Sequence, residues 1–222
     1  MVLLKYINRL AFCAMQHHIC LMQKTRDKQI SASVNPGSNI GFSIRHLWPM
    51  DIASYREHLL RLDPESRYSR FGGSVSDTYI NDYVDTALRP DTLIYGAFNE
   101  TQLIAAGELR ILFGTWPLRA ETAFSVEKLY QDHGLGDQLL SRIITAARNR
   151  GVTRLGMQCL SHNQRMRHLA QKHHAEMTTV DGETEAQLIP LTFNPISLFE
   201  EWMGEADGTL SRLNPWKQAG LQ

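Results

Sequence analysis

Apolar positions recur at two different spacings along residues 42–191, and each change of spacing marks the start of a new element. A spacing of two predicts strands, and a spacing of three or four predicts helices. The predicted strands are 42–47, 93–98, 103–111, 121–130, 154–160, 176–180 and 185–191. The predicted helices are 52–62, 79–88, 135–147 and 163–174. This order predicts an α/β protein with one mixed sheet and helices packed on it.

Turn and capping residues indicate where several of these elements end. Asp63-Pro64 is expected to stop the first helix, because the residue before a proline disfavours the helical conformation. Ser76 is a candidate N-cap for the second helix, which Pro90 is expected to stop. Asn99–Gln102 is predicted to join the second and third strands as a hairpin, and Asp181-Gly182 to join the last two.

Two segments lie outside this alternation and leave 41–193 as the predicted domain. Residues 1–40 are predicted to be an N-terminal extension and linker, and residues 194–222 a C-terminal helical tail. Polar and charged residues interrupt the apolar start of the extension: Lys5, Asn8, Arg9, Gln16, His17 and His18. This excludes a membrane-spanning helix, and no signal-peptide cleavage site follows. We expect an amphipathic or partly disordered arm, with a membrane-surface or partner helix as the alternative.

Charge and cysteine content narrow the class of protein. The chain has 23 basic and 23 acidic residues, so no strong global field favours nucleic acid or anionic lipid as a partner. The three cysteines are odd in number and form no C-x-x-C motif, which argues against a disulfide framework and a thiolate zinc site. The histidines at 162, 168, 173 and 174 form no i, i+4 pair, so no metal site is predicted. A reducing, cytoplasmic setting fits this composition best.

A glycine-rich turn precedes the most strongly amphipathic predicted helix. Residues 130–137 read YQDHGLGD, and a helix that begins at such a turn directs free N–H groups and its positive dipole end at an anion such as pyrophosphate. A Walker loop, G-x-x-x-x-G-K-[ST], does not occur in the sequence. The dinucleotide motif G-x-G-x-x-G also fails, because Leu139 occupies its third glycine position.

The remaining pattern is Gln131-x-x-Gly134-x-Gly136, preceded by a strand that contains Val126. It resembles the coenzyme A pyrophosphate loop of the GNAT superfamily, the acetyl-CoA-dependent N-acyltransferases. The resemblance extends over 42–191 and implies the GNAT fold, a central, mostly antiparallel sheet flanked by helices. It implies that acetyl-CoA is the cosubstrate and that an acetyl group passes by direct attack to a primary amine of a small molecule or a protein lysine. A bacterial, cytoplasmic protein that can form a homodimer fits this resemblance.

The resemblance also implies a set of cofactor residues. In such enzymes the pantetheine arm adds to the signature strand, where a bulge frees an N–H group for the thioester carbonyl. The implied residues are Phe124, Ser125, Val126, Gln131, Asp132, His133, Gly134, Leu135, Gly136, Asp137 and Asn163. Asp137 would repel a pyrophosphate, so we expect its side chain to point outward or to cap the helix.

The acceptor amine must lose its proton before it attacks, and a carboxylate usually removes that proton in the family. Glu121 at the start of the signature strand and Glu108 on the preceding strand are the candidates, and strand alternation leaves the choice open. Many members carry a tyrosine seven residues after the asparagine of the cofactor site, where this chain has Ala170. Without that general acid, a catalytically weak acyl-CoA-binding regulatory module is the alternative function. A nucleotide-binding fold without acyl chemistry is a third, weaker one.

The segment Arg61–Gly73, RLDPESRYSRFGG, is the other distinctive stretch. It resembles a segment of GNAT domains in bacterial protein acetyltransferases that borders the acceptor cleft. The alternative is a basic loop that anchors Tyr68 and Phe71 in the core.

Overall fold

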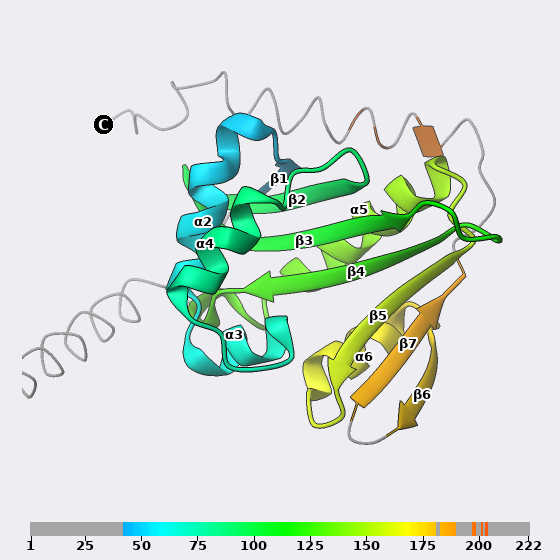
Figure 1. Cartoon of the computed structure of the whole chain (residues 1–222). Coiled ribbons are helices and arrows are strands. Elements are labelled where there is room, and N and C mark those ends of the chain that lie inside the picture. Colours follow the sequence, from blue (N-terminus) through cyan, green and yellow to red (C-terminus); the bar gives the residue numbers. More distant parts are fainter. Residues whose placement is uncertain (1–41, 181–182, 190–196, 199–200, 202, 204–222) are drawn as a thin grey trace, which may run out of the picture. The chain divides into compact units, whose positions relative to one another are not determined.

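Seven strands form one sheet in the computed structural model of the chain, in the order β1-β2-β3-β4-β5-β7-β6 (Figure 1). The structure describes residues 42–180, 183–189, 197–198, 201 and 203. The strands are β1 Ser43–His46, β2 Thr92–Asn99, β3 Gln102–Leu112, β4 Arg119–Val126, β5 Arg154–Leu160, β6 Glu176–Val180 and β7 Glu183–Leu188. The helices are α2 Ile52–Arg61, α3 Pro64–Phe71, α4 Asp77–Asp85, α5 Leu135–Asn149 and α6 Gln164–Lys172. Two 3-10 turns are η1 Pro49–Asp51 and η2 Lys128–Tyr130.

The sheet is antiparallel except where β4 pairs with β5 in parallel. That parallel pairing is short and ends at Thr122, which lies opposite Met157. Beyond this pair the two strands diverge (Figure 1), and none of the described strands pairs with that edge of β4 from Ala123 to Val126. The divergence leaves Ala123–Val126 of β4 without a partner among the described strands on that edge.

Each face of the sheet has its own apolar core. On one face α5 packs on the central strands through a wide apolar stripe: Leu135, Leu139, Leu140, Ile143, Ala146 and Ala147. On the other face α2 and α4 cover β2 and β3 with Tyr55, Leu59, Ile80 and Val84. Gly107 permits the close approach of α5, since a Cβ atom there would lie 2.9 Å from Ile143 Cδ1. The helices therefore fix the sheet from both sides (Figure 1).

Most of the predicted elements are present, and this architecture confirms the predicted mixed, mostly antiparallel sheet flanked by helices. Ser76 caps α4 as expected, by accepting a hydrogen bond from Tyr79 N at 3.1 Å. The strand predicted over 121–130 ends at Val126, and η2 follows. The predicted turn at 181–182 and the extension 1–40 lie outside the described residues.

Two local predictions are wrong. The stretch after Asp63 is a helix, α3, rather than the loop given as the alternative. Tyr68 is exposed and not anchored in the core, whereas Phe71 is partly buried and packs against the core beneath α2 and α4. The bulge expected in the signature strand is not found, because β4 pairs with β3 without interruption from Arg119 to Val126. Unpaired backbone groups arise there through the divergence of β5 instead. No helix in the described part of the chain has the length and apolar character needed to cross a membrane.

Candidate functional site

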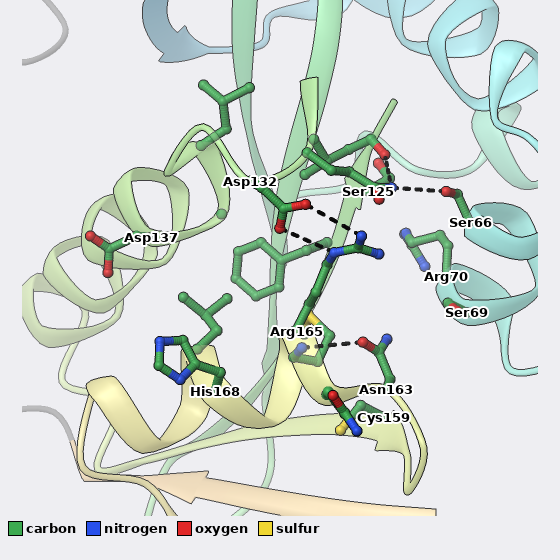
Figure 2. Close-up of a pocket in the computed structure, with 18 of the residues that line it drawn as sticks. Ser66, Ser69, Arg70, Ser125, Asp132, Asp137, Cys159, Asn163, Arg165 and His168 are labelled. Carbon is green, nitrogen blue, oxygen red and sulfur yellow. Dashed lines mark hydrogen bonds and ion pairs between the residues drawn. The ribbon is translucent and has the colours of Figure 1, made fainter. Parts of the chain in front are cut away.

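A cavity of about 790 Å³ opens where β4 and β5 diverge (Figure 2). Its walls are the end of β4, the loop 130–134, the first turn of α5, the end of β5 and α6, with α3 on the opposite side. All the predicted cofactor residues except His133 line this cavity. His133 instead turns back to its own loop, where Nδ1 lies 2.7 Å from Gln131 O.

The loop between β4 and α5 is shaped by residues with left-handed backbone conformation. Gly134 is the N-cap of α5 and has a φ of 76°. Asp132 also has a positive φ, 64°. The Gln131 side chain fixes the start of the loop, because its Nε2 donates to Val126 O and to Ser66 Oγ, each at 3.0 Å. This geometry aims the free N–H groups of the first turn of α5 at the cavity.

Gly136 is explained less fully by the protein's own packing. A Cβ atom there would lie 3.6 Å from Leu169 Cδ2, an ordinary contact. Gly134 is different, since its positive φ is strained for residues other than glycine. The backbone therefore favours glycine at 134. At 136 neither the backbone nor the packing requires glycine, so a reason for it would have to come from a ligand in the cavity.

Both carboxylates of the loop region are paired with cations of α6. Asp132 accepts from Arg165 Nε at 3.2 Å and Nη2 at 3.3 Å, and Figure 2 shows this pair at the cavity. Asp137 accepts from Lys172 Nζ at 2.9 Å and lies 2.8 Å from His173 Nε2. The bond from Lys172 lowers the pKa of Asp137. We expected Asp137 to cap its helix or to point outward. It makes no capping hydrogen bond, and its carboxylate instead links α5 to α6.

Asn163 caps α6, since its Oδ1 accepts a hydrogen bond from Met166 N at 3.2 Å. Seven residues later, Ala170 is fully buried in the core below the cavity. The cavity surface of α6 is formed by Gln164, Arg165, Met166, His168, Leu169 and Lys172.

A second cavity of about 310 Å³ adjoins the first. Both predicted glutamates, Glu108 and Glu121, line it. The two cavities share five lining residues: Ser69, Arg70, Ala123, Gln158 and Cys159. A ligand in one cavity can therefore meet a ligand in the other beside Ala123, at the point where β4 leaves β5.

Cross-strand pairing shows which way the two glutamates face. Glu108 lies opposite Ala123, and Arg110 lies opposite Glu121. Paired residues share a face of the sheet, and so do alternate residues along a strand. Both glutamates consequently lie on the face of Ala123 and Ser125, which α2, α3 and α4 cover, so strand alternation does not decide between them.

The two carboxyl groups have opposite environments. Glu108 is 8% exposed and receives hydrogen bonds from Tyr55, from Arg70 and, at 2.5 Å, from the Tyr83 hydroxyl. Burial raises the pKa of Glu108 above its usual range, and the Arg110 guanidinium opposes that rise. Glu121 is exposed at the mouth of the second cavity. Glu108 is thus held in place by its hydrogen bonds, while Glu121 is accessible to a ligand in the second cavity.

The sequence did not indicate the role of Arg70 or of His58. Arg70 extends from α3 to Glu108, and this helix was not predicted. His58 is fully buried on α2 and contacts Ser125, a cavity residue, at 2.8 Å. One signal was present: His58 occupies a position in the apolar stripe that contains Tyr55, Leu59 and Leu62, where a histidine needs a polar partner.

Comparison with known proteins connects this geometry to a family. A model of the acetyltransferase (GNAT) family matches residues 56–175. Among curated proteins no sequence matches the chain. Many solved structures are similar in fold.

The GNAT domain of PAT from S. lividans is 23% identical, with a TM-score of 0.57 over 66% of this chain and 89% of that one. The ribosomal-protein-S18-alanine N-acetyltransferase from Escherichia coli is 16% identical, with a TM-score of 0.53 over 70% and 97%. The PaiA N-acetyltransferase from Thermoplasma acidophilum, in complex with coenzyme A, is 20% identical, with a TM-score of 0.51 over 67% and 99%. At these identities the structural likeness concerns the fold.

Proposed function

Because the chain belongs to the acetyltransferase (GNAT) family and is therefore an acyltransferase, we propose that its substrates are acetyl-CoA and a primary amine. The observation that carries this proposal is the pair of adjoining cavities at the divergence of β4 and β5. One has anion-binding backbone groups at its far end, and the other has two glutamates. A thioester and an amine bound in them would meet beside Ala123.

The residues of the larger cavity fit coenzyme A. Its pyrophosphate would accept hydrogen bonds from the first-turn N–H groups of α5. The pantetheine arm would add to the unpaired edge of β4 from Ala123 to Val126, as a peptide adds to the edge of a sheet. The complex of the similar PaiA fold with coenzyme A supports this choice of ligand. Asn163, at the start of α6, would lie beside the pantetheine arm.

The smaller cavity fits the acceptor, and we assign the base to Glu121. A lysine-like amine has a pKa near 10.4, so its deprotonation at neutral pH costs about 4–5 kcal/mol. Glu121 is exposed in this cavity, whereas three donors already occupy Glu108. The free amine would attack the thioester carbonyl carbon as the C–S bond breaks. The departing thiolate has a thiol pKa near 8.5 and needs no tyrosine at position 170 to leave.

The test is acetyl-CoA binding measured by calorimetry on the unchanged chain and on two matched variants. Gly134→Asp and Gly151→Asp each place an aspartate at a positive φ, 76° and 71°, in open space. Each should lower the free energy of unfolding by about 1–3 kcal/mol, because both backbones are strained for aspartate. Only Gly134→Asp adds a carboxylate at the proposed pyrophosphate position, so only this variant should lose affinity, by about 100-fold or more.

Absence of binding by the unchanged chain would overturn the proposal. Equal losses in the two variants would mean that the loop acts through stability alone. Binding confined to the unchanged chain and to Gly151→Asp would support the assignment and justify a screen of amine acceptors.

A further inference from the structure

Three side chains form a hydrogen-bonded chain that begins at the wall of the larger cavity. Ser125 lines the cavity from β4 (Figure 2). Its Oγ lies 2.8 Å from Nε2 of His58 on α2, and Nδ1 of the same ring lies 3.1 Å from Oε1 of Glu127. His58 is fully buried and Ser125 is 5% exposed, while the side chain of Glu127 is 12% exposed, so the imidazole is shielded from water and both ends of the array are partly open. Neither the base nor the loop assigned above uses these groups.

The partners of His58 determine which ring nitrogen carries the proton. The Glu127 carboxylate can only accept, so Nδ1 carries a hydrogen and donates it. Nε2 is then the acceptor, and the Ser125 hydroxyl donates to it. Arg61 holds the carboxylate in place through Nη2 at 2.9 Å and Nε at 3.1 Å. Burial lowers the pKa of His58, which keeps the ring neutral and able to take a proton.

This order of hydroxyl, imidazole and carboxylate is the arrangement that activates a serine nucleophile. A hydrogen-bonded serine and histidine buried only for stability would face each other inside a core. Ser125 differs because it also lines the larger cavity, two residues along the same strand face from Ala123, where the two cavities meet. In the proposed complex the thioester would therefore lie within reach of its Oγ.

We propose that Ser125 is a nucleophile that takes the acyl group from a bound CoA thioester, which gives the chain a second activity, acyl-CoA hydrolysis, when no amine is present. This inference rests on the proposed binding of acetyl-CoA. His58 Nε2 takes the hydroxyl proton as Oγ bonds to the carbonyl carbon. The C–S bond breaks, and the imidazolium returns the proton to the thiolate. Free CoA then leaves, and the acetyl group remains as an ester on Ser125.

Water completes the reaction by the reverse steps. It attacks the ester carbonyl while His58 Nε2 accepts one of its protons. The bond between the carbonyl carbon and Ser125 Oγ breaks, and the imidazolium gives its proton to that oxygen. One acetyl-CoA and one water become acetate and free CoA, and both side chains return to their starting state. Glu127 acts as a positioning residue throughout, since it fixes the ring and stabilises the imidazolium.

The experiment is isotope exchange without an amine. Unlabelled acetyl-CoA is mixed with labelled CoA and the full chain, and label in acetyl-CoA is followed over time. Labelled CoA in excess competes with water for an acyl-serine intermediate and so carries label into acetyl-CoA, whereas direct transfer to an amine produces no exchange. Hydroxylamine trapping and peptide mass spectrometry should locate the acetyl ester at Ser125.

Variants assign the exchange to the array. Ser125→Ala and His58→Gln should each lower the exchange rate by about 100-fold or more, as expected for members of a catalytic unit. Ser141→Ala removes a hydroxyl on an exposed position of α5, and His46→Gln replaces a histidine packed against Trp48 and Tyr95. Both controls should stay within about twofold of the unchanged chain, as is usual for sites away from the reacting groups. If His58→Gln fails to fold, Ser125→Ala alone decides the outcome.

Calorimetry on the same samples separates the two proposals. Binding of acetyl-CoA without exchange would overturn the nucleophile and leave the amine transferase intact. Absence of binding would overturn both. Exchange that survives in Ser125→Ala would show that another group carries it and would also overturn the proposal.

Discussion

Glu108 and Glu121 differ in how many hydrogen bonds their carboxylates already accept from the protein. Three donors from three helices converge on Glu108, which ties α2, α3 and α4 to the sheet through Tyr55, Arg70 and Tyr83. Glu121 lies diagonally across the same sheet face, exposed in the smaller cavity. A base must be free to bond the proton it removes. Occupied acceptors suit Glu108 to a structural role and leave proton transfer to Glu121.

Glutamine substitutions should separate these roles. Glu121→Gln should lower kcat for amine acetylation by about 10²–10⁴-fold while acetyl-CoA affinity is retained, because only proton transfer is lost. Glu108→Gln should lower the free energy of unfolding by about 1–3 kcal/mol, since one amide oxygen replaces two carboxylate acceptors of three donors. Glu185→Gln removes a charge from the same cavity and should change kcat by less than about tenfold.

Steady-state kinetics and urea unfolding on the three variants provide the readouts. A stable Glu108→Gln protein without turnover would reverse the assignment. If the unchanged chain binds acetyl-CoA and acetylates no amine, it is better described as an acyl-CoA-binding regulatory module, the alternative that the alanine at position 170 suggested.

Helix α3 shows how two elements can meet at a single dipeptide. Helix α2 ends at Arg61, and Leu62 already has a non-helical backbone. Asp63, the residue before Pro64, is extended and begins α3 as its N-cap. Asp63 has φ −64° and ψ 160°, and its Oδ1 accepts from Glu65 N and Ser66 N, each at 3.2 Å. Gly72 ends the helix with a φ of 69°. This short helix carries Ser69 and Arg70, which border both cavities.

Asp63→Ala should therefore lower the free energy of unfolding by about 1 kcal/mol through loss of the cap. Burial acts to raise the pKa of Asp63, but the hydrogen bonds from Ser66 and Glu65 hold it below its ordinary value. The folded state thus releases this proton more readily than the unfolded chain. The charged cap's extra stability is complete above the unfolded pKa, about 3.9, and is lost as the pH falls through the folded pKa.

Urea unfolding at pH 7 and pH 3 measures both effects. The difference between the unchanged chain and Asp63→Ala should shrink at pH 3. Asp63→Ser keeps a capping oxygen that does not titrate, so its advantage over Asp63→Ala should be the same at both pH values. If Asp63→Ala lowers the free energy of unfolding by the same amount at both pH values, the carboxylate charge does not contribute to the cap.

The elements that the sequence predicted are those whose signals are local. Periodicity and caps identified the strands, α4, α5 and the glycine loop, because neighbours in the sequence determine them. Asp63-Pro64 has two local meanings, stop and start, and only the stop was predicted. The contact of His58 with Ser125 joins residues 67 positions apart and depends on how α2 crosses β4, so no local pattern contains it. The divergence of β4 from β5 is equally a property of the assembled sheet.

At the scale of the whole molecule, the site exists because one pair of strands in the sheet separates. Continuous pairing of β4 with β5 would satisfy the backbone and close the larger cavity. Helix α5 contacts β4 from one face of the sheet, and α3 contacts it from the other. Binding at this position therefore adds hydrogen bonds that the protein itself leaves unmade.

The described residues of the C-terminal tail contribute to the same framework at the far end of α5. Ser197 is buried, and its Oγ donates to Asn149 Oδ1 at 2.5 Å, while Asn149 Nδ2 donates to Ser197 O at 3.0 Å. Glu201 accepts from Asn149 Nδ2 at 2.5 Å, from Arg150 at 2.8 Å and from Tyr95 at 3.3 Å. Burial acts to raise the pKa of Glu201, but these bonds lower it. The tail thus satisfies polar groups that the predicted domain 41–193 would leave open.

Removal of residues 194–222 should consequently lower the free energy of unfolding by about 2–4 kcal/mol, since Asn149 loses partners and Glu201 takes its charge-assisted bonds with it. Glu201→Ala in the full chain should cost about 1–3 kcal/mol for the same reason. Glu57→Ala, which removes an exposed ion pair with Arg61, should cost less than about 1 kcal/mol. Urea unfolding measures all three.

Acetyl-CoA affinity should survive the truncation, because no tail residue lines either cavity among the described residues. Lost affinity in a truncated protein of unchanged stability would instead make the tail part of the site, and the domain would then have to extend beyond residue 193.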